Sequence, residues 1–285
     1  MNMENTKTLS IIIVNWNTRD LLRRCLESVG ATVPPLSFEV IVVDNASTDG
    51  SPDMVAESFP DALLIRNPSN DGFAAANNLG LAKSNSKYVM LLNPDAELHP
   101  GAVQRMIDFA DAHPEAAVVG PRLLNSDGSL QKNGQKFPTF AREFLHITKL
   151  YRFMGSSFDR IYEWGRDDFD KTSEVDSVTG ACMLVRSEAV KAVGLLDDIF
   201  FMYYEEVDWC YRMHRAGWKV YYLPDAVVTH HHGQASEKIG LTKMRIAYNS
   251  QFLYFRKHHG VAQALILRIL AGFALIFMSA KRRRS

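Results

Sequence analysis

The chain has 285 residues, enough to bury a full hydrophobic core as one large α/β domain or two small ones. Its composition, 47% hydrophobic and 22% charged, is that of a globular protein and argues against a disordered chain. Because 32 basic residues balance 32 acidic ones, the basic excess typical of a general nucleic-acid binder is missing. Three isolated cysteines without CxxC spacing indicate buried free thiols in a reducing compartment: Cys25, Cys182 and Cys210.

Strand and helix patterns alternate through the first half of the chain. Strands are predicted over residues 10–15, 38–43, 63–66 and 88–92, and the first of them is apolar on both faces, as in a buried parallel strand. Helical patterns fall between them, after Thr18, at Ser51-Pro52 and over residues 73–81. This alternation predicts a mostly parallel central sheet with helices on both faces.

The second half is more mixed, and no linker divides the chain into two independent domains. Its expected segments are, in order, a short strand over 117–119, irregular chain over 131–174, strand character over 175–185, a helix from Glu205 to Ala216 closed by Gly217, and a last strand over 220–223 stopped by Pro224. The irregular stretch suits a mobile or acceptor-facing region.

Polar residues end each of the four predicted strands of the first half. They are Asn15-Trp16-Asn17, Asp44-Asn45, Asn67 and Asn93-Pro94-Asp95. Ligands of an open parallel sheet bind outside the carboxyl ends of its strands. Asp44-Asn45 alone is also compatible with a turn and helix cap, and Asn93-Pro94-Asp95 with an Asx turn. Four such ends together favour a binding edge.

Asp95 is the candidate metal ligand at this edge. A divalent ion that bridges a diphosphate takes few protein ligands, because phosphate oxygens and waters supply the rest. His230, the first of three consecutive histidines after the last strand, is the candidate second ligand. The alternative interpretation of the histidine run is a solvent-exposed loop.

Three acids open the helix of the second half, namely Glu205, Glu206 and Asp208, behind an aromatic run over residues 200–204. Acidic residues suit a helix N-terminus, and Asp208 can pair with Arg212. One of the acids is equally compatible with a general base in an aromatic-lined pocket. The chain has no GxGxxG after its first strand, no P-loop and no GxSxG, which argues against a dinucleotide oxidoreductase, a P-loop NTPase and a serine hydrolase.

Six segments occur in an order that resembles a known family: IIIVNWNTRDLLRRCLESV, EVIVVDNASTDGS, NDGFAAANNLG, YVMLLNPDAELHPGAV, VTGACMLVR and FFMYYEEVDWCYRMHRAGWKVYYLPDAVVTHHHG. Together they resemble the family-2 inverting glycosyltransferases of the GT-A fold, most of all the bacterial rhamnosyltransferase-like branch. The resemblance implies a GT-A domain over residues 8–235, with a Rossmann-like sugar-nucleotide-binding half over 8–120 and a mixed acceptor and catalytic half over 121–235. Residues 236–285 would form a C-terminal helical, membrane-proximal segment with a basic tail.

The resemblance also implies roles for individual residues. The implied nucleotide-sugar contacts are Asp44 at the pyrimidine base with Asn15, Asn17 and Asn45 beside it, Gly72, Asn77 and Asn78 near the ribose and diphosphate, and Asn93 with Asp95. Asp95 matches the last acid of the metal-binding DxD motif, whose first position holds Asn93, and His230 matches a histidine that completes the metal site. Glu206 falls at the catalytic base, with Asp208 as the alternative base. Residues expected near the donor or acceptor sugar are Gly180, Tyr204, Glu205 and Trp209, although core packing is an equal alternative for Tyr204 and Trp209.

The implied reaction is transfer of a sugar with inversion, assisted by Mg²⁺ or Mn²⁺. The branch suggests dTDP-L-rhamnose as donor, with a UDP-hexose as the alternative, and a lipid-linked or surface-polysaccharide acceptor. Two alternative functions come from other classes of protein. One is a nucleotidyltransferase, which would carry a Gly-rich basic loop after the first strand, and the other is a non-catalytic sugar-nucleotide-binding protein.

The two ends of the chain bear on localisation. The polar start followed by a short apolar run is no signal peptide, so a cytoplasmic protein is expected. Residues 261–280 are long and apolar enough for a membrane span, yet Arg268 near the middle costs roughly 2.5–3.5 kcal/mol on insertion scales. A bulky face of Ile266, Ile269, Leu270, Phe273 and Phe277 opposes a face of Ala264, Arg268, Gly272 and Ser279. This favours a helix at the inner membrane surface, with the basic residues 281–284 on anionic headgroups, and a buried core helix is the alternative.

Overall fold

The computed structural model describes residues 7–33, 36–158, 169–231 and 240–282. The strands are β1 (Lys7–Asn15), β2 (Phe38–Asn45), β3 (Leu63–Asn67), β4 (Ser86–Leu92), β5 (Ala96–Leu98), β6 (Ala116–Leu124), β7 (Leu130–Gln131), β8 (Ser173–Val175), β9 (Cys182–Arg186) and β10 (Lys219–His230). The helices are α1 (Arg19–Thr32), α2 (Ser51–Ser58), α3 (Phe73–Leu81), α4 (Ala102–Ala112), α5 (Phe140–Thr148), the 3₁₀ turn η1 (Leu150–Phe153), α6 (Ser156–Phe158), α7 (Ser187–Val193), α8 (Glu205–Arg215), α9 (Gly240–His258) and α10 (Val261–Arg282).

The described strands form one ten-stranded sheet. Its main path runs β3-β2-β1-β4-β9-β6-β10-β5, with β7 beside β6 and β8 beside β10. Strands β3, β2, β1 and β4 are parallel, β9 runs antiparallel between β4 and β6, and β10 is parallel to β6. Parallel neighbours need crossover connections, which α1, α2 and α3 provide. The predicted mostly parallel sheet flanked by helices is confirmed.

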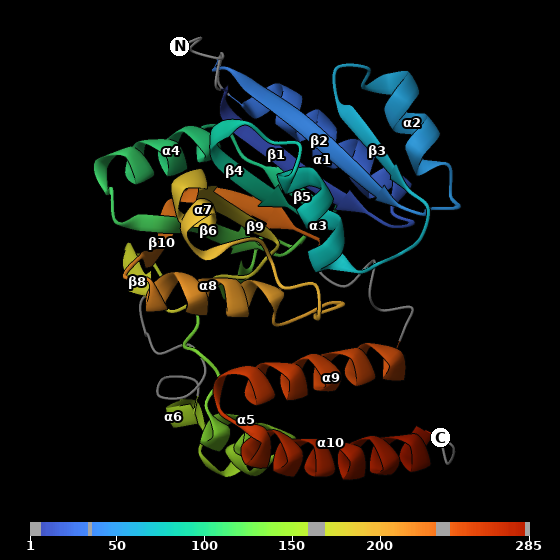
Figure 1. The fold of residues 1–285 in the computed structure, drawn as a ribbon, viewed down its shortest axis with the longest axis vertical. Coiled ribbons are helices and arrows are strands. Elements are labelled where there is room, and N and C mark those ends of the chain that lie inside the picture. Colours follow the sequence, from blue (N-terminus) through green and yellow to red (C-terminus); the bar gives the residue numbers. More distant parts are fainter. Residues whose placement is uncertain (1–6, 34–35, 159–168, 232–239, 283–285) are drawn as a thin grey trace.

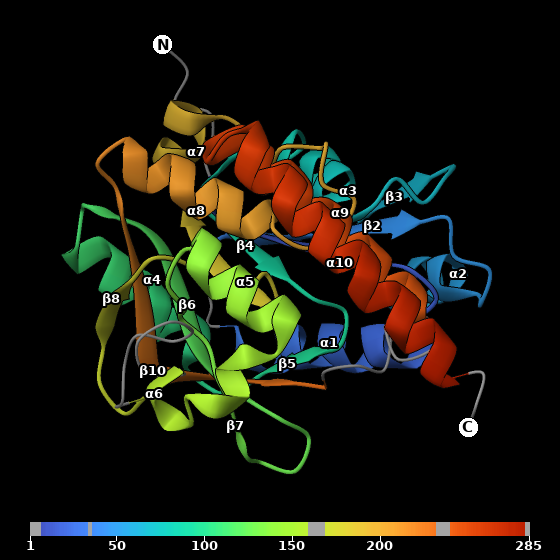
Figure 2. The ribbon, with the colours of Figure 1, turned by 90° about the horizontal axis from the view of Figure 1, so that it is seen from below.

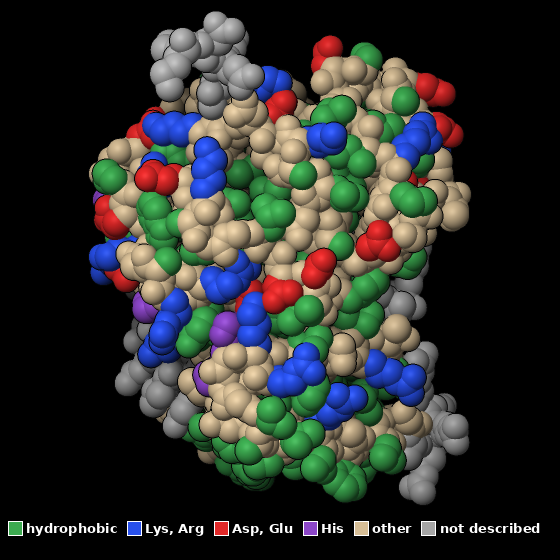
Figure 3. Space-filling view, in the orientation of Figure 1, with side chains coloured by type: hydrophobic (Ala, Val, Ile, Leu, Met, Phe, Trp, Pro, Cys, Tyr) green, Lys and Arg blue, Asp and Glu red, His purple; other side chains and the backbone are tan. Residues whose placement is uncertain are grey.

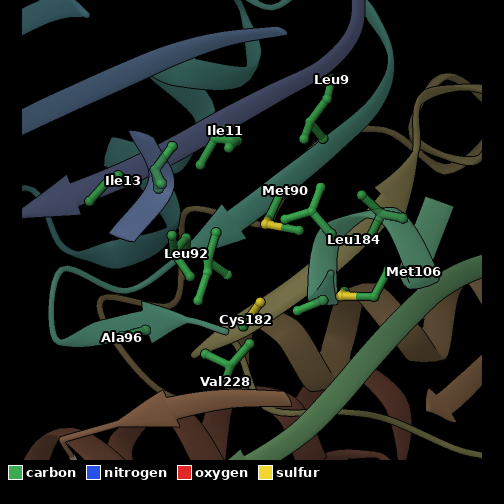
Figure 4. Close-up of a cluster of buried hydrophobic side chains, with 14 of the residues drawn as sticks. Leu9, Ile11, Ile13, Met90, Leu92, Ala96, Met106, Cys182, Leu184 and Val228 are labelled. Carbon is green, nitrogen blue, oxygen red and sulfur yellow. The ribbon is translucent and has the colours of Figure 1, made fainter. Parts of the chain in front are cut away.

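Helices cover both faces of the sheet (Figure 1). Helices α1, α2 and α4 pack on one face, where Ile11, Met90 and Leu184 converge from β1, β4 and β9 (Figure 4). Helices α3, α7 and α8 pack on the other face against Ile12 and its neighbours. Adjacent residues of β1 are thus fully buried on opposite faces, which explains why this strand is apolar throughout.

A third layer lies beyond α8, where α5, α9 and α10 share a separate hydrophobic cluster (Figures 1 and 2). Helices α9 and α10 form a hairpin in which Ala264, Leu267 and Ala271 of α10 are buried. The bulky residues Phe273 and Phe277 point away and are 67% and 70% exposed. Among the described residues, α10 is also the one helix long and apolar enough to cross a membrane, judged by length and composition alone.

Three expectations about the second half are wrong. The stretch over 131–174 contains α5, η1, α6 and the start of β8 rather than irregular chain, and the strand expected over 175–185 is two strands, β8 and β9. Pro224 does not end the last strand: β10 continues through it, because a register shift between Leu223 and Val227 removes the need for a ladder hydrogen bond at the proline.

The predicted division into a domain over 8–235 and a C-terminal segment over 236–285 stays a prediction, since its boundary lies outside the described residues. The same holds for His232 and for the basic residues at 283 and 284. Lys281 and Arg282 form the last turn of α10.

Candidate active site

The parallel register of β1 and β2 places Asn15 opposite Asp44 at the carboxyl edge of the sheet. Asn15 Nδ2 donates to Asp44 Oδ1 at 3.0 Å and to Ser47 Oγ at 3.0 Å, and Ser47 N donates to Asp44 Oδ2 at 3.0 Å. Asn17 adopts φ +54° and accepts a hydrogen bond from Thr48 N at 2.7 Å. The predicted turn is therefore present, and it fixes the Asp44 carboxylate at the binding edge.

Asn45 holds the loop between β3 and α3. Its Nδ2 donates to Asn70 Oδ1 at 2.8 Å and to Gly72 O at 3.2 Å, and its Oδ1 accepts from Asn67 Nδ2 at 2.8 Å. Gly72 has φ +90°, and a Cβ added there would lie 2.2 Å from the carbonyl oxygen of Phe201. Glycine is therefore required where this loop meets the segment that precedes α8.

Helix α3 contributes two asparagines that the sequence places near the donor. Asn77 is 1% exposed and donates to Phe73 O at 2.9 Å. Asn78 Nδ2 donates to Leu196 O at 2.8 Å, and Leu196 N donates to Asn78 Oδ1 at 3.1 Å. Both side chains thus brace α3, and their contact with a sugar nucleotide stays a prediction.

The structure brings Asp95 and His230 together across the β5–β10 pairing. Asp95 Oδ1 lies 3.2 Å from His230 Nε2, Asn93 Nδ2 lies 3.4 Å from the same nitrogen, and both Asp95 and His230 are 6% exposed. The described residues contain no group of three or more metal-ligating side chains. One carboxylate and one imidazole nevertheless fit a divalent cation whose other ligands come from a bound diphosphate and water.

Gln131 is a site residue that sequence reasoning missed. His230 Nδ1 lies 2.7 Å from Gln131 Oε1, an atom that only accepts, so the geometry assigns the ring proton to Nδ1 and turns Nε2 toward Asp95. His231 is not in an exposed loop either, because its ring contacts Glu97 Oε1 at 2.8 Å and Ser126 Oγ at 2.7 Å. No sequence signal marks Gln131, which lies 99 residues before its partner in the two-residue strand β7.

Two carboxyl groups at the start of α8 have buried oxygens without a hydrogen-bond partner in the described structure, Glu205 Oε2 and Glu206 Oε2. Burial raises the pKa of Glu206 to about 7. Burial and then the charge of Glu206 raise the pKa of Glu205 well above its usual value. A Cβ added at Gly180 would lie 3.8 Å from Glu206 Cβ and 3.4 Å from the Phe73 ring, so Gly180 borders Glu206. A carboxyl group with one buried, unpartnered oxygen and a raised pKa is a candidate for proton transfer.

The turn before α8 has an unusual backbone. Tyr203 and Tyr204 both have φ +70°, and each such residue costs on the order of 1–3 kcal/mol. Tyr204 packs with the α9 cluster and lies 5.4 Å from the Tyr254 ring, centroid to centroid. Its predicted contact with a sugar is untested, and the structure accounts for the ring by packing.

Asp208 and Trp209 are both held by contacts within the fold. Asp208 is fully buried. Burial alone would raise its pKa, but hydrogen bonds from His258, Lys257 and Arg212 lower that pKa to about 2, which makes it a poor base compared with Glu206. Trp209 is also fully buried, and its Nε1 donates to Gly194 O at 2.8 Å. The indole therefore packs in the core, which is the alternative to sugar stacking that the sequence left open for Trp209.

The fold and the candidate site together are those expected of a GT-A glycosyltransferase: a mostly parallel sheet with polar strand ends, an Asp–His pair and buried carboxyl oxygens at a helix start. Residues 10–194 match the family "Glycosyl transferase family 2". The chain belongs to this family and is a glycosyltransferase of GT-A fold.

Curated relatives cover nearly the whole chain. It is 28% identical over 266 residues to N-acetylglucosaminyl-diphospho-decaprenol L-rhamnosyltransferase of Mycobacterium tuberculosis, which covers 89% of this chain and 86% of that protein. It is 25% identical to dTDP-rhamnosyl transferase RfbF of Shigella flexneri, with 87% and 80% covered. A solved structure of similar fold is the mannosyltransferase PcManGT from Pyrobaculum calidifontis in complex with GDP-Man and Mn²⁺, at TM-score 0.60 and 17% identity, covering 96% of this chain and 75% of that one.

Replacement of Gln131 by Ala should weaken divalent-cation binding by about 10- to 100-fold, because the His230 ring loses the acceptor that orients it. Isothermal titration of Mn²⁺ into protein saturated with a nucleoside diphosphate would measure this. The matched control is Gln104→Ala, which removes an exposed glutamine that hydrogen-bonds Asp108 on α4. Equal Mn²⁺ affinity of the Gln131 variant and this control would contradict the orienting role.

Proposed function

We propose that this glycosyltransferase moves L-rhamnose from dTDP-L-rhamnose to a lipid-linked or cell-surface polysaccharide acceptor, with inversion at the anomeric carbon. The observation that carries the catalytic part is the Glu206 carboxyl, whose Oε2 is buried without a hydrogen-bond partner among the described residues, on a side chain whose Cβ borders Gly180. The donor and acceptor classes are supported by the two rhamnosyltransferase relatives, one of which is named for a diphospho-decaprenol acceptor.

Different residues of the donor-binding half would bind different parts of the sugar nucleotide. Asp44, fixed by Asn15 and Ser47, is placed to accept a hydrogen bond from the N–H of a pyrimidine base. The loop held by Asn45 would follow the ribose and diphosphate toward the Asp95–His230 pair. Pyrimidine specificity would then come from the fixed carboxylate, because the turn leaves it little freedom to adapt.

Asp95 and His230 would hold a divalent cation, Mg²⁺ or Mn²⁺, together with the diphosphate of the donor. A cation bound there supplies charge neutralisation for the leaving nucleoside diphosphate. The neutral Asn93 in the first position of the motif means that the protein provides a single carboxylate. Asn93 Nδ2 lies 3.4 Å from His230 Nε2, the nitrogen that would face the cation, so this contact would give way when a cation binds.

Glu206 would act as the general base in one displacement. As the acceptor oxygen bonds to the anomeric carbon, its proton passes to the Glu206 carboxylate and the bond from that carbon to the diphosphate oxygen breaks. A Cβ at Gly180 would contact both the Phe73 ring and Glu206 Cβ, so a larger side chain there would crowd the approach of an acceptor to Glu206. The lowered pKa of Asp208 makes it unsuited to take the proton.

Donor turnover tests this proposal. A panel containing dTDP-L-rhamnose, UDP-glucose and UDP-galactose should release nucleoside diphosphate with dTDP-L-rhamnose in the presence of Mg²⁺ or Mn²⁺. Asp95→Ala should lower the rate at least about 100-fold through the lost charge neutralisation, and Glu206→Gln by about 10²- to 10⁴-fold. Release of pyrophosphate would indicate a nucleotidyltransferase, and wild-type rates in both folded variants would contradict the mechanism.

The pH dependence of kcat/KM offers a separate check. The proton acceptor must be ionised, and burial raises the pKa of Glu206 to about 7, so the rate should fall about tenfold per unit as the pH drops below that value. Any residual activity of Glu206→Gln should lack this acidic limb. A limb centred near 4.5, the ordinary glutamate value, would contradict the assignment, provided that circular dichroism reports the same fold across the range.

Peripheral contact with the inner membrane surface is the second part of the proposal. Residues 240–285 contain nine Lys and Arg and no Asp or Glu, so in a chain of zero net charge residues 1–239 carry nine excess acids. In Figure 3 hydrophobic side chains form the lower edge of the molecule over α10, and Lys and Arg side chains lie above them over α9. Such a combination suits a helix that lies in the headgroup region of an anionic leaflet while the acidic catalytic part faces away.

Phe273→Ser combined with Phe277→Ser should lower binding to vesicles of phosphatidylglycerol and phosphatidylcholine by at least about tenfold, because each phenylalanine contributes roughly 1.5–3 kcal/mol when buried. Cosedimentation would measure it, with Leu63→Ser combined with Leu79→Ser as the control for exposed apolar residues elsewhere. Deleting α10 is a poorer test, since it would uncover the cluster that Leu267 fills. Unchanged partitioning of the Phe273 and Phe277 variant would exclude this face as the contact.

A further inference from the structure

Asp208 lies two residues after Glu206 and has no exposed side-chain surface, although the proposed chemistry does not use it. Its Oδ1 accepts from Lys257 Nζ at 2.7 Å and from His258 Nε2 at 2.7 Å, and its Oδ2 accepts from Arg212 Nε at 2.8 Å. Lys257 and His258 end α9, whereas Arg212 belongs to α8. A single buried carboxylate thus connects the helix that carries Glu206 to the C-terminal hairpin.

The basic partners of Asp208 extend this connection to a third segment. Arg212 donates to Val193 O and to Leu195 O, both at 2.7 Å. Lys257 also pairs with Asp197 Oδ2 at 2.6 Å. The segment over 193–197 that follows α7 is therefore held against α8 and α9 by the groups that neutralise Asp208.

Helix α9 also contacts the turn that precedes Glu206 in the chain. Ser250 Oγ donates to Met202 O at 2.8 Å, and Gln251 Nε2 donates to Glu143 Oε2 at 2.6 Å next to Tyr204. Residues Tyr203 and Tyr204 have φ +70° and persist in that conformation only where their surroundings hold them. Contacts from α9 thus lie on both sides of the catalytic position.

We infer that Asp208 is a positioning residue, through which α9 fixes α8 so that the Glu206 carboxyl stays beside Gly180. The hairpin is then part of the catalytic apparatus in addition to its proposed membrane contact. This inference rests on the proposed role of Glu206 as base. The reacting geometry tolerates little displacement, and a shift of about 1 Å in a catalytic group can lower a rate by about 100-fold.

Asp208→Asn and Lys257→Met test the inference in the full-length protein. We expect each to lower kcat by about 10- to 100-fold while KM for dTDP-L-rhamnose changes less than about threefold, because the direct partners of Asp208 lie on α8 and α9, whereas Asn15 and Asp44 lie on β1 and β2. In the double variant the loss should be close to that of the more damaging single variant, since both remove one anchor. The matched control is Asp111→Asn. It removes a carboxylate that accepts hydrogen bonds from Lys87 and Tyr88 at the start of β4, whereas the candidate site lies at the carboxyl end of that strand.

Hydrogen exchange separates positioning from general stability. Amides over 202–206 should exchange faster in Lys257→Met than in the wild type, whereas those of β1 should not. A wild-type kcat in both variants, or a loss of kcat equal to that of the Asp111→Asn control, would overturn the inference. An active Glu206→Gln protein would show separately that the proposed function is wrong. In that case the exchange measurement would still report whether α9 holds the turn.

Discussion

The site depends on the register of four parallel strands. Because β1 pairs with β2 so that Asn15 faces Asp44, and β1 pairs with β4, the polar residues after each strand arrive at one edge together. A slip of one residue would exchange the two faces of a strand and move Ile11 and Ile13 out of their cluster. The same apolar packing that sets the register therefore sets the geometry of the binding edge. The antiparallel strand β9 then begins at that edge, which brings Gly180 to it.

Local patterns in the sequence were sufficient for the parallel half of the fold. The apolar strands, the alternating helices and the polar strand ends follow from composition over short windows, and the pairing of Asp95 with His230 came from the resemblance to the family. What local patterns left open or missed has causes elsewhere in the fold. Trp209 packs in the core with its Nε1 bonded to the Gly194 carbonyl, and Pro224 is tolerated because β10 shifts register there. Gln131 and Lys257 reach their partners from 99 and 49 residues away, and neither stands in a recognisable pattern.

The C-terminal hairpin shows how one helix can have two partners. On α10 the buried residues are Ala264, Leu267 and Ala271, and the two alanines allow close approach to α9 and α5. The bulky residues Ile266, Ile269, Phe273 and Phe277 are exposed instead, and an exposed apolar patch is typical of an interaction surface. The sequence left the choice between membrane span, surface helix and core helix open. Under the proposed membrane contact, the buried face of α10 packs on α9 and α5 while its exposed bulky face meets the lipid surface.

Because the proposed cation site has one carboxylate, it would favour a cation that binds together with a diphosphate over a free cation. A second acid in place of Asn93 would add negative charge beside Asp95, which favours binding of a free cation and repels a diphosphate when no cation is bound. With an amide there, the pair of Asp95 and His230 holds a cation weakly by itself and needs phosphate oxygens to complete the coordination. Metal and sugar nucleotide would then bind as one unit. The raised pKa of Glu206 leaves this carboxyl about half ionised near neutral pH, so both its proton-accepting form and its neutral form are available in that range.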